Sequence, residues 1–376
     1  MLTANADKTR TNLFIIYKFN NLFSQILSVL SKFAEFMLPS QTIIFNSDHD
    51  LALANNDASF VPPHSAAFFS RDCASIMRFL DDPSPIVVWG WDKAVRHRLL
   101  RDGVDARELP SDADLERVRD LSHRRMSIKC ADFLMEGTAH PLWCQTSARE
   151  AFSVEDARAL VEDYGDTIIK SPWSSSGKGL RPVRRDSWTA SDLGWCEKII
   201  AKQGSVIVER RKVVARDFSY QFRVEPSDVH FYGFSLFKTS HGAYTGNLLA
   251  SNENMLSILS SYIDPGFVME VKDGVAEFLR WEFCGKYTGT IGVDMFIDSL
   301  GTLTPCVELN VRNNMGLIAR NYFDWHIDPS ESGKYEMAVL YSPDNAELSR
   351  QICESRELLT DFTPQSHYAV VCRESR

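Results

Sequence analysis

The sequence predicts a mixed fold in which a small α/β domain is followed by a larger α+β region. The α/β prediction rests on two short apolar runs, 41–46 and 86–89, with helical spacing over 92–101 after the second run. Strands that alternate with helices in this way form parallel sheets. The α+β prediction rests on 229–238 and 243–249, where apolar and polar residues alternate as they do in antiparallel strands.

Composition narrows the class of protein. A length of 376 residues allows two or three domains with a large core. The net charge of −9 argues against a nucleic-acid surface, although it leaves room for a local basic groove. The eight cysteines are scattered without a C-x-x-C pair, which favours reduced thiols over a disulfide framework or a zinc site. We therefore expect a cytoplasmic protein without a nucleic-acid partner.

The first 36 residues form an N-terminal extension that has two readings. Residues 11–36 are apolar and aromatic, but Lys18 and Lys32 interrupt them, so we expect neither a stable membrane span nor a signal peptide. The extension is either an amphipathic helix that docks on the protein or a membrane surface, or a non-native segment preceding a start at Met37. The first predicted strand begins just after Met37, which favours the second reading.

The rest of the chain carries helices and strands with clear end signals. Residues 115–136 have helical spacing and end at Gly137, and Ser153 caps a helix with Glu155 and Asp156 in its first turn. Further helices are expected at 188–203, 255–262 and 268–283, and strands at 168–170, 205–209, 218–224 and 289–298. A closing βαβ-like appendage is expected from a strand at 335–341, a helix at 346–358 and an apolar run at 368–372.

A strand that ends in Lys170 leads into a loop of small residues. The loop contains Ser174, Ser175, Ser176, Gly177 and Gly179. Small residues let the backbone approach a ligand closely and aim several N–H groups at an anion, so the composition is that of a phosphate cradle. The spacing differs from the common P-loop, and an ordinary turn is the alternative reading.

A second group of polar residues lies on a predicted hairpin. A turn at 298–301 places Asp294 beside positions 307 and 308 of the next strand. Glu308, Asn310 and Arg312 are two residues apart, so they share one face, while Val307 and Leu309 should point into the core. Carboxylate and amide oxygens suit Mg²⁺, and the arginine suits a phosphate. The alternative is the polar outer face of an exposed hairpin.

Taken in order, these parts resemble the ATP-grasp superfamily of the carboxylate–amine ligase type. The resemblance covers 37–322 and includes the small first domain, the lysine with its Ser/Gly loop, Glu209 before a hinge, and Asp294 followed by Glu308-x-Asn310-x-Arg312. It implies an N-terminal pre-ATP-grasp domain, an ATP-grasp domain with a nucleotide lobe and a metal and substrate lobe, and an appendage. The expected boundaries are 1–36, 37–120, 121–325 (divided into 121–209 and 210–325) and 326–376.

The resemblance also implies a role for each matching residue. Lys170 would contact the ATP phosphates and Arg312 would lie near the transferred phosphate, as the two catalytic cations. The metal ligands for Mg²⁺ or Mn²⁺ would be Asp294, Glu308 and Asn310. The residues expected to bind ATP are those of the cradle loop (Ser174, Ser175, Ser176, Gly177 and Gly179), the hinge (Glu209, Arg210, Arg211 and Lys212) and the ribose acid Asp217.

Members of the superfamily usually have a further phosphate-binding lysine early in the nucleotide-binding domain. In this chain the corresponding window holds Arg124 and Arg125, and Arg125 is the residue we expect to contact the nucleotide. An arginine can bind a phosphate as well as a lysine can.

The implied activity is ATP-dependent ligation, in which a carboxylate is phosphorylated and an amine attacks the acyl phosphate. Two alternatives stay open: a phosphotransferase on the same scaffold, and a nucleotide-binding protein without catalysis. The partners would be small-molecule acids and amines. Whether the chain forms a homodimer is left open by the sequence. The residues that could contact substrate are Asp48, His49, Asp50, Asn55, Arg223, His241 and Arg280.

Overall fold

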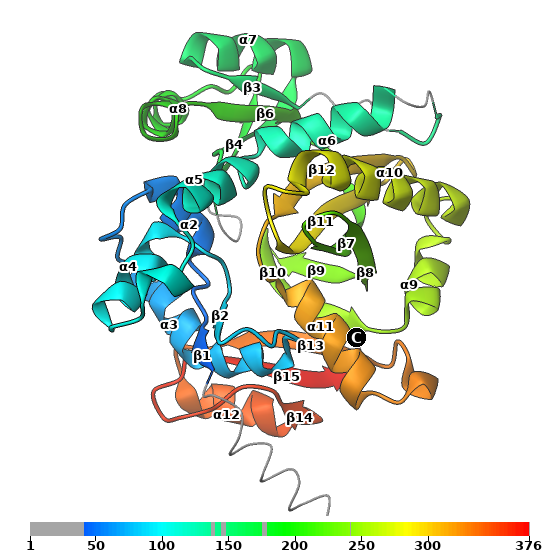
Figure 1. The fold of residues 1–376 in the computed structure, drawn as a ribbon. Helices are drawn as coiled ribbons and strands as arrows, with labels where there is room; N and C mark the ends of the chain where they lie inside the picture. The colour runs from blue at the N-terminus through cyan, green and yellow to red at the C-terminus, as the bar shows by residue number, and fades with distance from the viewer. Residues whose placement is uncertain (1–40, 137–139, 144–147, 175–178, 241, 376) are drawn as a thin grey trace, which may run out of the picture. The chain divides into compact units, whose positions relative to one another are not determined.

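The computed structural model describes most of the chain after the N-terminal extension (Figure 1). The described ranges are 41–136, 140–143, 148–174, 179–240 and 242–375. The extension 1–36 therefore lies outside the described residues. Two compact units are distinguished, Met1–Ile43 with Asp82–Val87 and Ile44–Asp81 with Val88–Arg376. Every side chain of the site described below belongs to the second unit.

The N-terminal region contains the small parallel sheet that the sequence predicted. Its two strands are β1 (Thr42–Ile44) and β2 (Ile86–Val88). The helices of this region are α2 (His49–Asn55), α3 (His64–Asp72), η1 (Ala74–Phe79), α4 (Lys93–Arg101), η2 (Ala106–Glu108) and α5 (Asp112–Leu121).

The predicted helix over 115–136 is wrong in one respect, because it is two helices. The first, α5, ends at Leu121, and α6 spans Arg125–Glu136. No glycine or proline separates them in the sequence. The cause is tertiary: the Arg124 N–H donates to the carbonyl of Pro172 at 3.2 Å, outside the helical pattern. The break lets the Arg124 side chain leave the helix axis.

A four-stranded antiparallel sheet carries Lys170 and Glu209. Its order is β3-β6-β4-β5, with bounds Arg149–Ala151, Val206–Arg210, Asp166–Lys170 and Leu180–Arg184 respectively. The helices α7 (Val154–Tyr164) and α8 (Ala190–Gln203) pack against it around Val161, Ile169 and Cys196. Ser153 and Thr189 cap these helices by accepting from the third backbone N–H, as Ser/Thr caps do.

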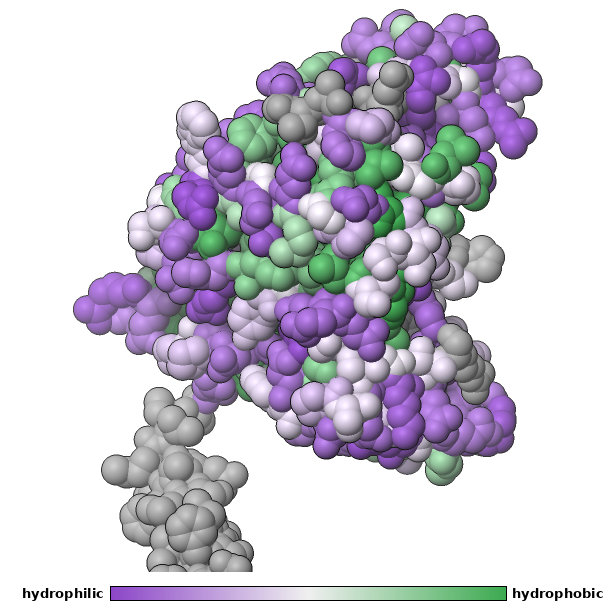
Figure 2. Space-filling model, turned by 90° about the vertical axis from the view of Figure 1, so that its right-hand side faces the viewer, coloured by the Kyte–Doolittle hydropathy of each residue, from purple (hydrophilic) through white to green (hydrophobic). Residues whose placement is uncertain are grey.

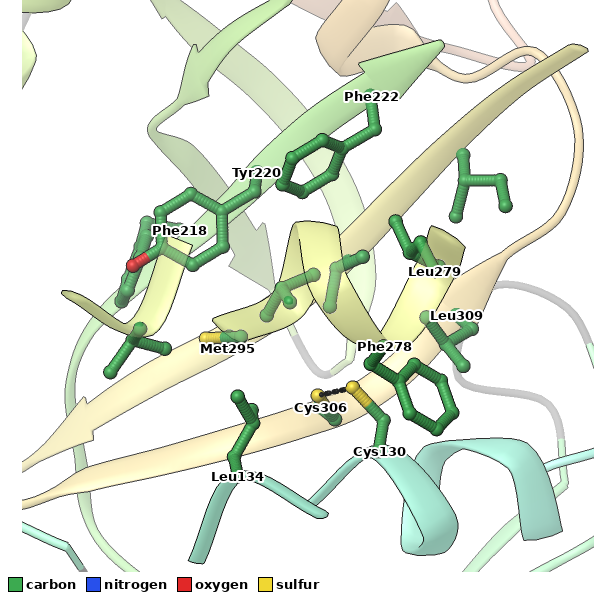
Figure 3. Close-up of a cluster of buried hydrophobic side chains, with 14 of the residues drawn as sticks. Cys130, Leu134, Phe218, Tyr220, Phe222, Phe278, Leu279, Met295, Cys306 and Leu309 are labelled. Carbon is green, nitrogen blue, oxygen red and sulfur yellow. Dashed lines mark hydrogen bonds between the residues drawn. The ribbon is translucent and has the colours of Figure 1, made fainter. Parts of the chain in front are cut away.

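A second four-stranded sheet separates the main core from the polar residues of the site. Its order is β12-β11-β7-β8, with bounds Leu303–Asn310, Gly289–Asp298, Val214–Val224 and Val229–Ser235 respectively. Phe218, Tyr220 and Phe222 alternate along β7 and point into the core that Figure 3 shows. The helices α6, α9 (Asn252–Leu259) and α10 (Pro265–Phe283) cover this face. Residues between them on β7 therefore face the other way.

The third sheet corrects the expected form of the C-terminal appendage. Its order is β14-β15-β13-β10-β9, and its strands span Glu357–Leu358, Tyr368–Glu374, Tyr335–Tyr341, Ala243–Leu249 and Phe237–Ser240 respectively. β13 and β15 pair antiparallel, so this is no βαβ unit, and α12 (Asn345–Cys353) is shorter than predicted. The remaining helices are α11 (Met315–His326) and η3 (Pro329–Glu331). The C-terminal strands extend the sheet of β9 and β10.

The distribution of hydropathy fits this layering. On the face shown in Figure 2, hydrophobic residues gather toward the middle and hydrophilic residues lie above and below them. Among the described helices, none has both the length and the apolar character that a membrane span requires.

Candidate functional site

A cavity of about 630 Å³ lies on the polar side of β7, β11 and β12. It extends to Lys170 at the end of β4, to Glu209 on β6 and to Asp50 on α2. A volume of this size is typical of small-molecule sites, which take about 300–1,000 Å³. Residues from segments far apart in the sequence therefore meet in one space.

The predicted acid pair is confirmed by the register of the sheet. Asp294 on β11 lies opposite Glu308 on β12 and opposite Ser219 on β7. Asn310 lies two residues beyond Glu308, and its Nδ2 donates to Asp294 Oδ2 at 2.9 Å. The three proposed metal ligands thus share one face, which also lines the cavity.

The electrostatics of the acid pair fit a cation. Burial, followed by the charge of Glu308, raises the pKa of Asp294 from its ordinary 3.8 to about 7. Asn310 and Arg312 oppose this rise only in part. Within the described ranges no three His, Cys, Asp or Glu residues lie close enough together to hold a metal ion. At the acid pair the third oxygen ligand would be the amide oxygen of Asn310. Two carboxylates and an amide oxygen are ligands that Mg²⁺ accepts, so the residues fit the ion.

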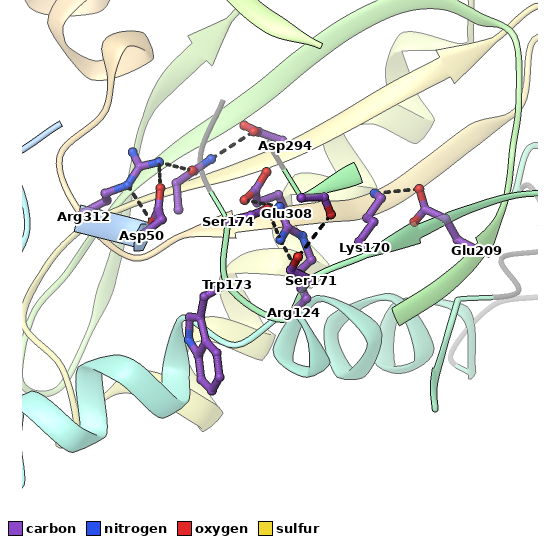
Figure 4. Close-up of polar contacts among 12 residues, drawn as sticks. Asp50, Arg124, Lys170, Ser171, Trp173, Ser174, Glu209, Asp294, Glu308 and Arg312 are labelled. Atoms are coloured by element: carbon purple, nitrogen blue, oxygen red, sulfur yellow. Dashed lines mark hydrogen bonds and ion pairs between the residues drawn. The ribbon is translucent and has the colours of Figure 1, made fainter. Parts of the chain in front are cut away.

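Lys170 and Glu209 form a close ion pair at the edge of the cavity. Lys170 Nζ lies 2.6 Å from Glu209 Oε1, and both residues line the cavity (Figure 4). The pair is held in place because β4 and β6 are neighbours, with Ile168 opposite Glu209. A buried ammonium with a carboxylate at this distance is held in position by it.

Arg124 enters the site where Arg125 was expected. Its guanidinium donates to the Ser171 carbonyl at 2.6 Å, to Ser174 Oγ at 2.9 Å and to Glu308 Oε1 at 2.7 Å (Figure 4). The side chain of Arg125 instead donates to Glu150 at 2.8 Å and is half exposed. The predicted nucleotide contact of Arg125 is therefore not supported by its placement. The sequence offered the right pair of arginines but no signal to choose between them.

The described part of the cradle loop is closed by tight backbone contacts. The Ser171 N–H donates to the Gly179 carbonyl at 2.9 Å. Gly179 has φ +125°, and a Cβ there would lie 2.5 Å from the Cβ of Ser174, so only glycine fits. Ser174 is buried and lines the cavity. Ser175, Ser176 and Gly177 lie outside the described residues.

The side chains of the basic hinge turn away from the cavity or bridge its strands. Arg210 lies over the ring of Tyr164, and Arg211 is 3.9 Å from Asp166. Lys212 Nζ donates to Thr304 Oγ1 at 3.2 Å. Arg210 and Lys212 also line a small neighbouring cavity with Lys170 and Glu209, so a nucleotide there would meet side chains of this segment as well as its backbone.

Asp217 lines the cavity on β7, two residues before Ser219. Burial raises the pKa of its carboxyl, and a long hydrogen bond from Thr239 Oγ1, at 3.5 Å, opposes that rise. The acid is therefore only weakly held by the protein and is free to accept from a ligand.

An apolar slot beside Lys170 was missed by sequence reasoning. Ile168, Leu180, Val214, Phe296 and Val307 all line the cavity. Ile168 could have been found from the two-residue period, since it shares a strand face with Lys170.

Val307 was predicted to point into the core, and that prediction is wrong. A bulge between Asp294 and Phe296, with Cys306 at φ +50°, breaks the alternation of the hairpin. Leu309, beyond the bulge, does lie in the core as predicted.

Arg312 connects α2 to the strand face that carries Asp294, Glu308 and Asn310, which is called the metal face below. It donates to both oxygens of Asp50, at 3.3 and 2.8 Å, and to Asn310 Oδ1 at 2.9 Å. Burial alone would raise the pKa of Asp50, but the charge and hydrogen bonds of Arg312 outweigh burial and lower it. The guanidinium also lies over the ring of Trp89, 5.9 Å from its centre. Asp50 was expected among the possible substrate contacts, with no partner named for it. In the structure its partner is Arg312.

Of the other residues expected near substrate, some line the cavity and others lie away from it. Asp48 lines the cavity, whereas His49 is buried with its Nδ1 3.2 Å from Asp92. Arg223 and Arg280 are exposed and lie near Glu225 and Asp228. Asn55 lies at the C-terminal end of α2, where it is partly buried, and His241 lies outside the described residues.

Comparison with solved structures identifies the fold. An N5-carboxyaminoimidazole ribonucleotide synthetase, solved as an ADP complex, matches with a TM-score of 0.52 at 13% sequence identity. The match covers 90% of this chain and 93% of that one. The chain has the ATP-grasp fold.

Two further structures with this ATP-grasp fold are more distant. An N5-carboxyaminoimidazole synthase from Aspergillus clavatus has a TM-score of 0.46 at 12% identity, covering 77% of this chain and 76% of its own. An L-amino acid ligase from Bacillus licheniformis has a TM-score of 0.44 at 11% identity, with the same two coverages. Only the first structure exceeds 0.5, so the ATP-grasp assignment depends on it. No family model matches the sequence, and no curated protein matches it.

Proposed function

We propose that this ATP-grasp protein is an ATP- and Mg²⁺-dependent ligase that joins a carboxylic acid to an amine. The observation that carries the proposal is the meeting of the acid pair, Asp294 and Glu308, with Lys170 and Arg312 in one cavity. A third cation, Arg124, lies beside this cavity and donates to Glu308 at 2.7 Å. Positioning and charge neutralisation by such groups account for most of the catalysis of phosphoryl transfer. The synthetase of similar fold was solved with ADP, which agrees with a nucleotide in this cavity.

The apolar slot is the place we assign to adenine. Ile168, Leu180, Phe296 and Val307 offer the hydrocarbon surfaces between which a flat base can lie. Asp217 would accept hydrogen bonds from the ribose hydroxyls, because the bond it accepts from Thr239 is long, at 3.5 Å.

The phosphates would extend from the slot toward the acid pair. Lys170 and Arg124 would bind them, since both lie at the end of β4 where the cradle loop begins. Arg124 is anchored by the Ser171 carbonyl and by Ser174, so its charge is already oriented before a ligand arrives.

Asp294, Glu308 and Asn310 are the residues that would hold Mg²⁺. The ion supplies a Lewis acid that draws charge from the phosphate oxygens. In this chain Asn310 also fixes Arg312, through its Oδ1, and Asp294, through its Nδ2. The amide therefore sets the distance between the metal face and the arginine.

Arg312 would hold the phosphoryl group as it moves from ATP to the acid. An oxygen of the substrate carboxylate attacks the γ-phosphorus, and the bond to ADP breaks. The amine nitrogen then attacks the acyl carbon, phosphate leaves with the bonding electron pair, and the nitrogen loses a proton. No protein nucleophile takes part, and the bidentate bond to Asp50 keeps the guanidinium in place.

The test is ADP release by the purified chain with Mg²⁺, measured against pooled carboxylic acids with and without pooled amines. We expect release that requires both an acid and an amine, and its loss in Glu308→Gln. The matched control is Glu225→Gln, since Glu225 is a half-exposed acid that pairs with Arg223 away from the cavity. ADP release with a hydroxyl compound and no amine would instead identify a phosphotransferase. Nucleotide binding without turnover in any pool would identify a binding protein.

A further inference from the structure

Asp48 is a buried carboxylate that the proposed reaction does not use. It is 8% exposed, it precedes α2, and it lines the cavity. Among the described residues no side chain donates a hydrogen bond to it or forms an ion pair with it, whereas Asp50, two residues later, is held by Arg312. A buried carboxylate without a partner is costly, so it indicates a place where a ligand supplies the partner.

The charges around Asp48 also favour a positive ligand. Burial raises the pKa of its carboxyl, and the charge of Asp92 adds to this effect. Its own backbone N–H, His49 and the exposed Arg98 act in the opposite direction but do not cancel the rise. A cation placed beside Asp48 would therefore stabilise the ionised form that the protein alone stabilises poorly.

Three aromatic rings line the same cavity as this carboxylate. One of them lies on α3, which is joined to the residue before Asp48 because the Ser47 N–H donates to Ser70 Oγ at 3.1 Å. Phe69 on α3, Trp89 after β2 and Tyr368 on β15 all line the cavity. They are one cluster, because the ring centres of Phe69 and Tyr368 are 5.1 Å apart and both Phe69 and Trp89 pack on Phe45, at 5.7 and 4.9 Å. Aromatic faces attract ammonium groups and also cover hydrocarbon.

Arg312, a guanidinium that also lines the cavity, is the residue assigned above to the phosphoryl group, and its orientation is set by other partners than Asp48. It donates to Asp50 and to Asn310. An anionic ligand group beside Asp48 would meet a carboxylate, while a cationic group would meet a free carboxylate and aromatic faces. Asp48, Phe69, Trp89 and Tyr368, which all line the cavity, are together called the acidic subsite below.

We propose that the acidic subsite binds the amine substrate as an ammonium ion, with the aromatic cluster covering its hydrocarbon part. Asp48 accepts the hydrogen bonds of the ammonium and then the proton that the nitrogen loses before it attacks. This inference rests on the proposed function, since it assigns the second substrate of the same cavity. It narrows that substrate to amines that are protonated at neutral pH and carry an aliphatic or aromatic body. Amines that carry a phosphate or carboxylate next to the nitrogen are disfavoured.

The test is calorimetric binding of small cations to the full chain with Mg²⁺ and ADP. The probes are benzylamine, phenethylamine and butylamine, each compared with the alcohol of the same shape. We expect at least one amine to bind at least about tenfold more tightly than its alcohol. A difference of this size is what one hydrogen bond between charged groups contributes to binding. Asp48→Asn should abolish this preference, and Asp57→Asn, an exposed acid of the same region, should leave it unchanged.

Three results would overturn the proposal: equal binding of amines and alcohols, unchanged amine binding by Asp48→Asn, or no binding of any amine. ADP binding is measured separately in the same variants, and Asp48→Asn should keep it because Asp48 lies outside the assigned nucleotide slot. If the native chain failed to bind ADP, the proposed function would fail. Amine binding that depends on Asp48 could still be measured without ADP, so the two failures are distinguishable.

Discussion

Replacing Asp294 by Asn removes one charge from the acid pair with little change in side-chain shape. Burial and the charge of Glu308 raise the pKa of Asp294 to about 7 from the ordinary 3.8. At 1.36 kcal/mol per pH unit, this difference means that the ionised side chain costs the folded state up to about 4 kcal/mol. Water in the open cavity screens part of this repulsion, so we expect a cost of about 1–3 kcal/mol.

The sign of the pH dependence follows from the two pKa values of Asp294. The folded state holds a proton that the unfolded chain releases between 3.8 and about 7. The free energy of unfolding therefore falls as pH rises through that window, and the cost is absent at lower pH. A divalent ion between Asp294 and Glu308 should remove the cost at any pH at which it binds.

The assay is thermal unfolding of the wild type and Asp294→Asn, with EDTA or with excess Mg²⁺. At about pH 8 in EDTA the variant should melt several degrees higher than the wild type, and at about pH 4 the difference should be small. Mg²⁺ should stabilise the wild type and leave the variant unchanged. Asp273→Asn, at an exposed acid, is the control and should behave as the wild type. An unchanged melting temperature of the wild type in Mg²⁺ would refute the reasoning. So would a lower melting temperature of Asp294→Asn than of the wild type in EDTA at about pH 8.

Variants at three further positions test other contacts of the site. Arg124→Met should weaken ADP binding at least about tenfold in calorimetry, while Arg124→Lys keeps most of the affinity because a charge remains. If both bound ADP as the wild type does, Arg124 would not be a phosphate ligand. Gly179→Ala should weaken ADP binding, because its Cβ would collide with Ser174 at φ +125°; unchanged binding would show that the loop adjusts freely. Asp50→Asn should lower the free energy of unfolding in urea by about 2–4 kcal/mol near neutral pH, because it leaves Arg312 buried and half paired. Since Arg312 lowers the pKa of Asp50, this loss should shrink only as pH falls below the ordinary value of 3.8; an equal loss at all pH values would contradict the ion pair.

Much of the site could be predicted because its residues lie close together in the sequence. The two-residue period of a strand and one turn were enough to place Asp294 beside Glu308, with Asn310 on the same face. The helix cap Ser153, which was also predicted, acts within a few residues of itself. Such features depend on backbone geometry that a short stretch of chain sets alone.

The predictions that failed depended on contacts between distant segments. The break before α6 follows from a hydrogen bond between Arg124 and Pro172, and that bond also decides that Arg124, not Arg125, reaches Glu308. Val307 faces the cavity because a bulge at Cys306 shifts the strand by one residue. A shift of one residue reverses the side of the sheet that a side chain faces, and composition gives no sign of it.

The sequence by itself determined the class of fold, the hairpin of acids and the strand lysine with its loop. Only the tertiary structure decided which charges face one another: Arg312 with Asp50, Lys170 with Glu209, and Asp48 with no side-chain partner among the described residues. The reason is physical. Periodicity determines the face on which a side chain lies, but the partner across a cavity comes from a segment whose distance in the sequence carries no information about its distance in space.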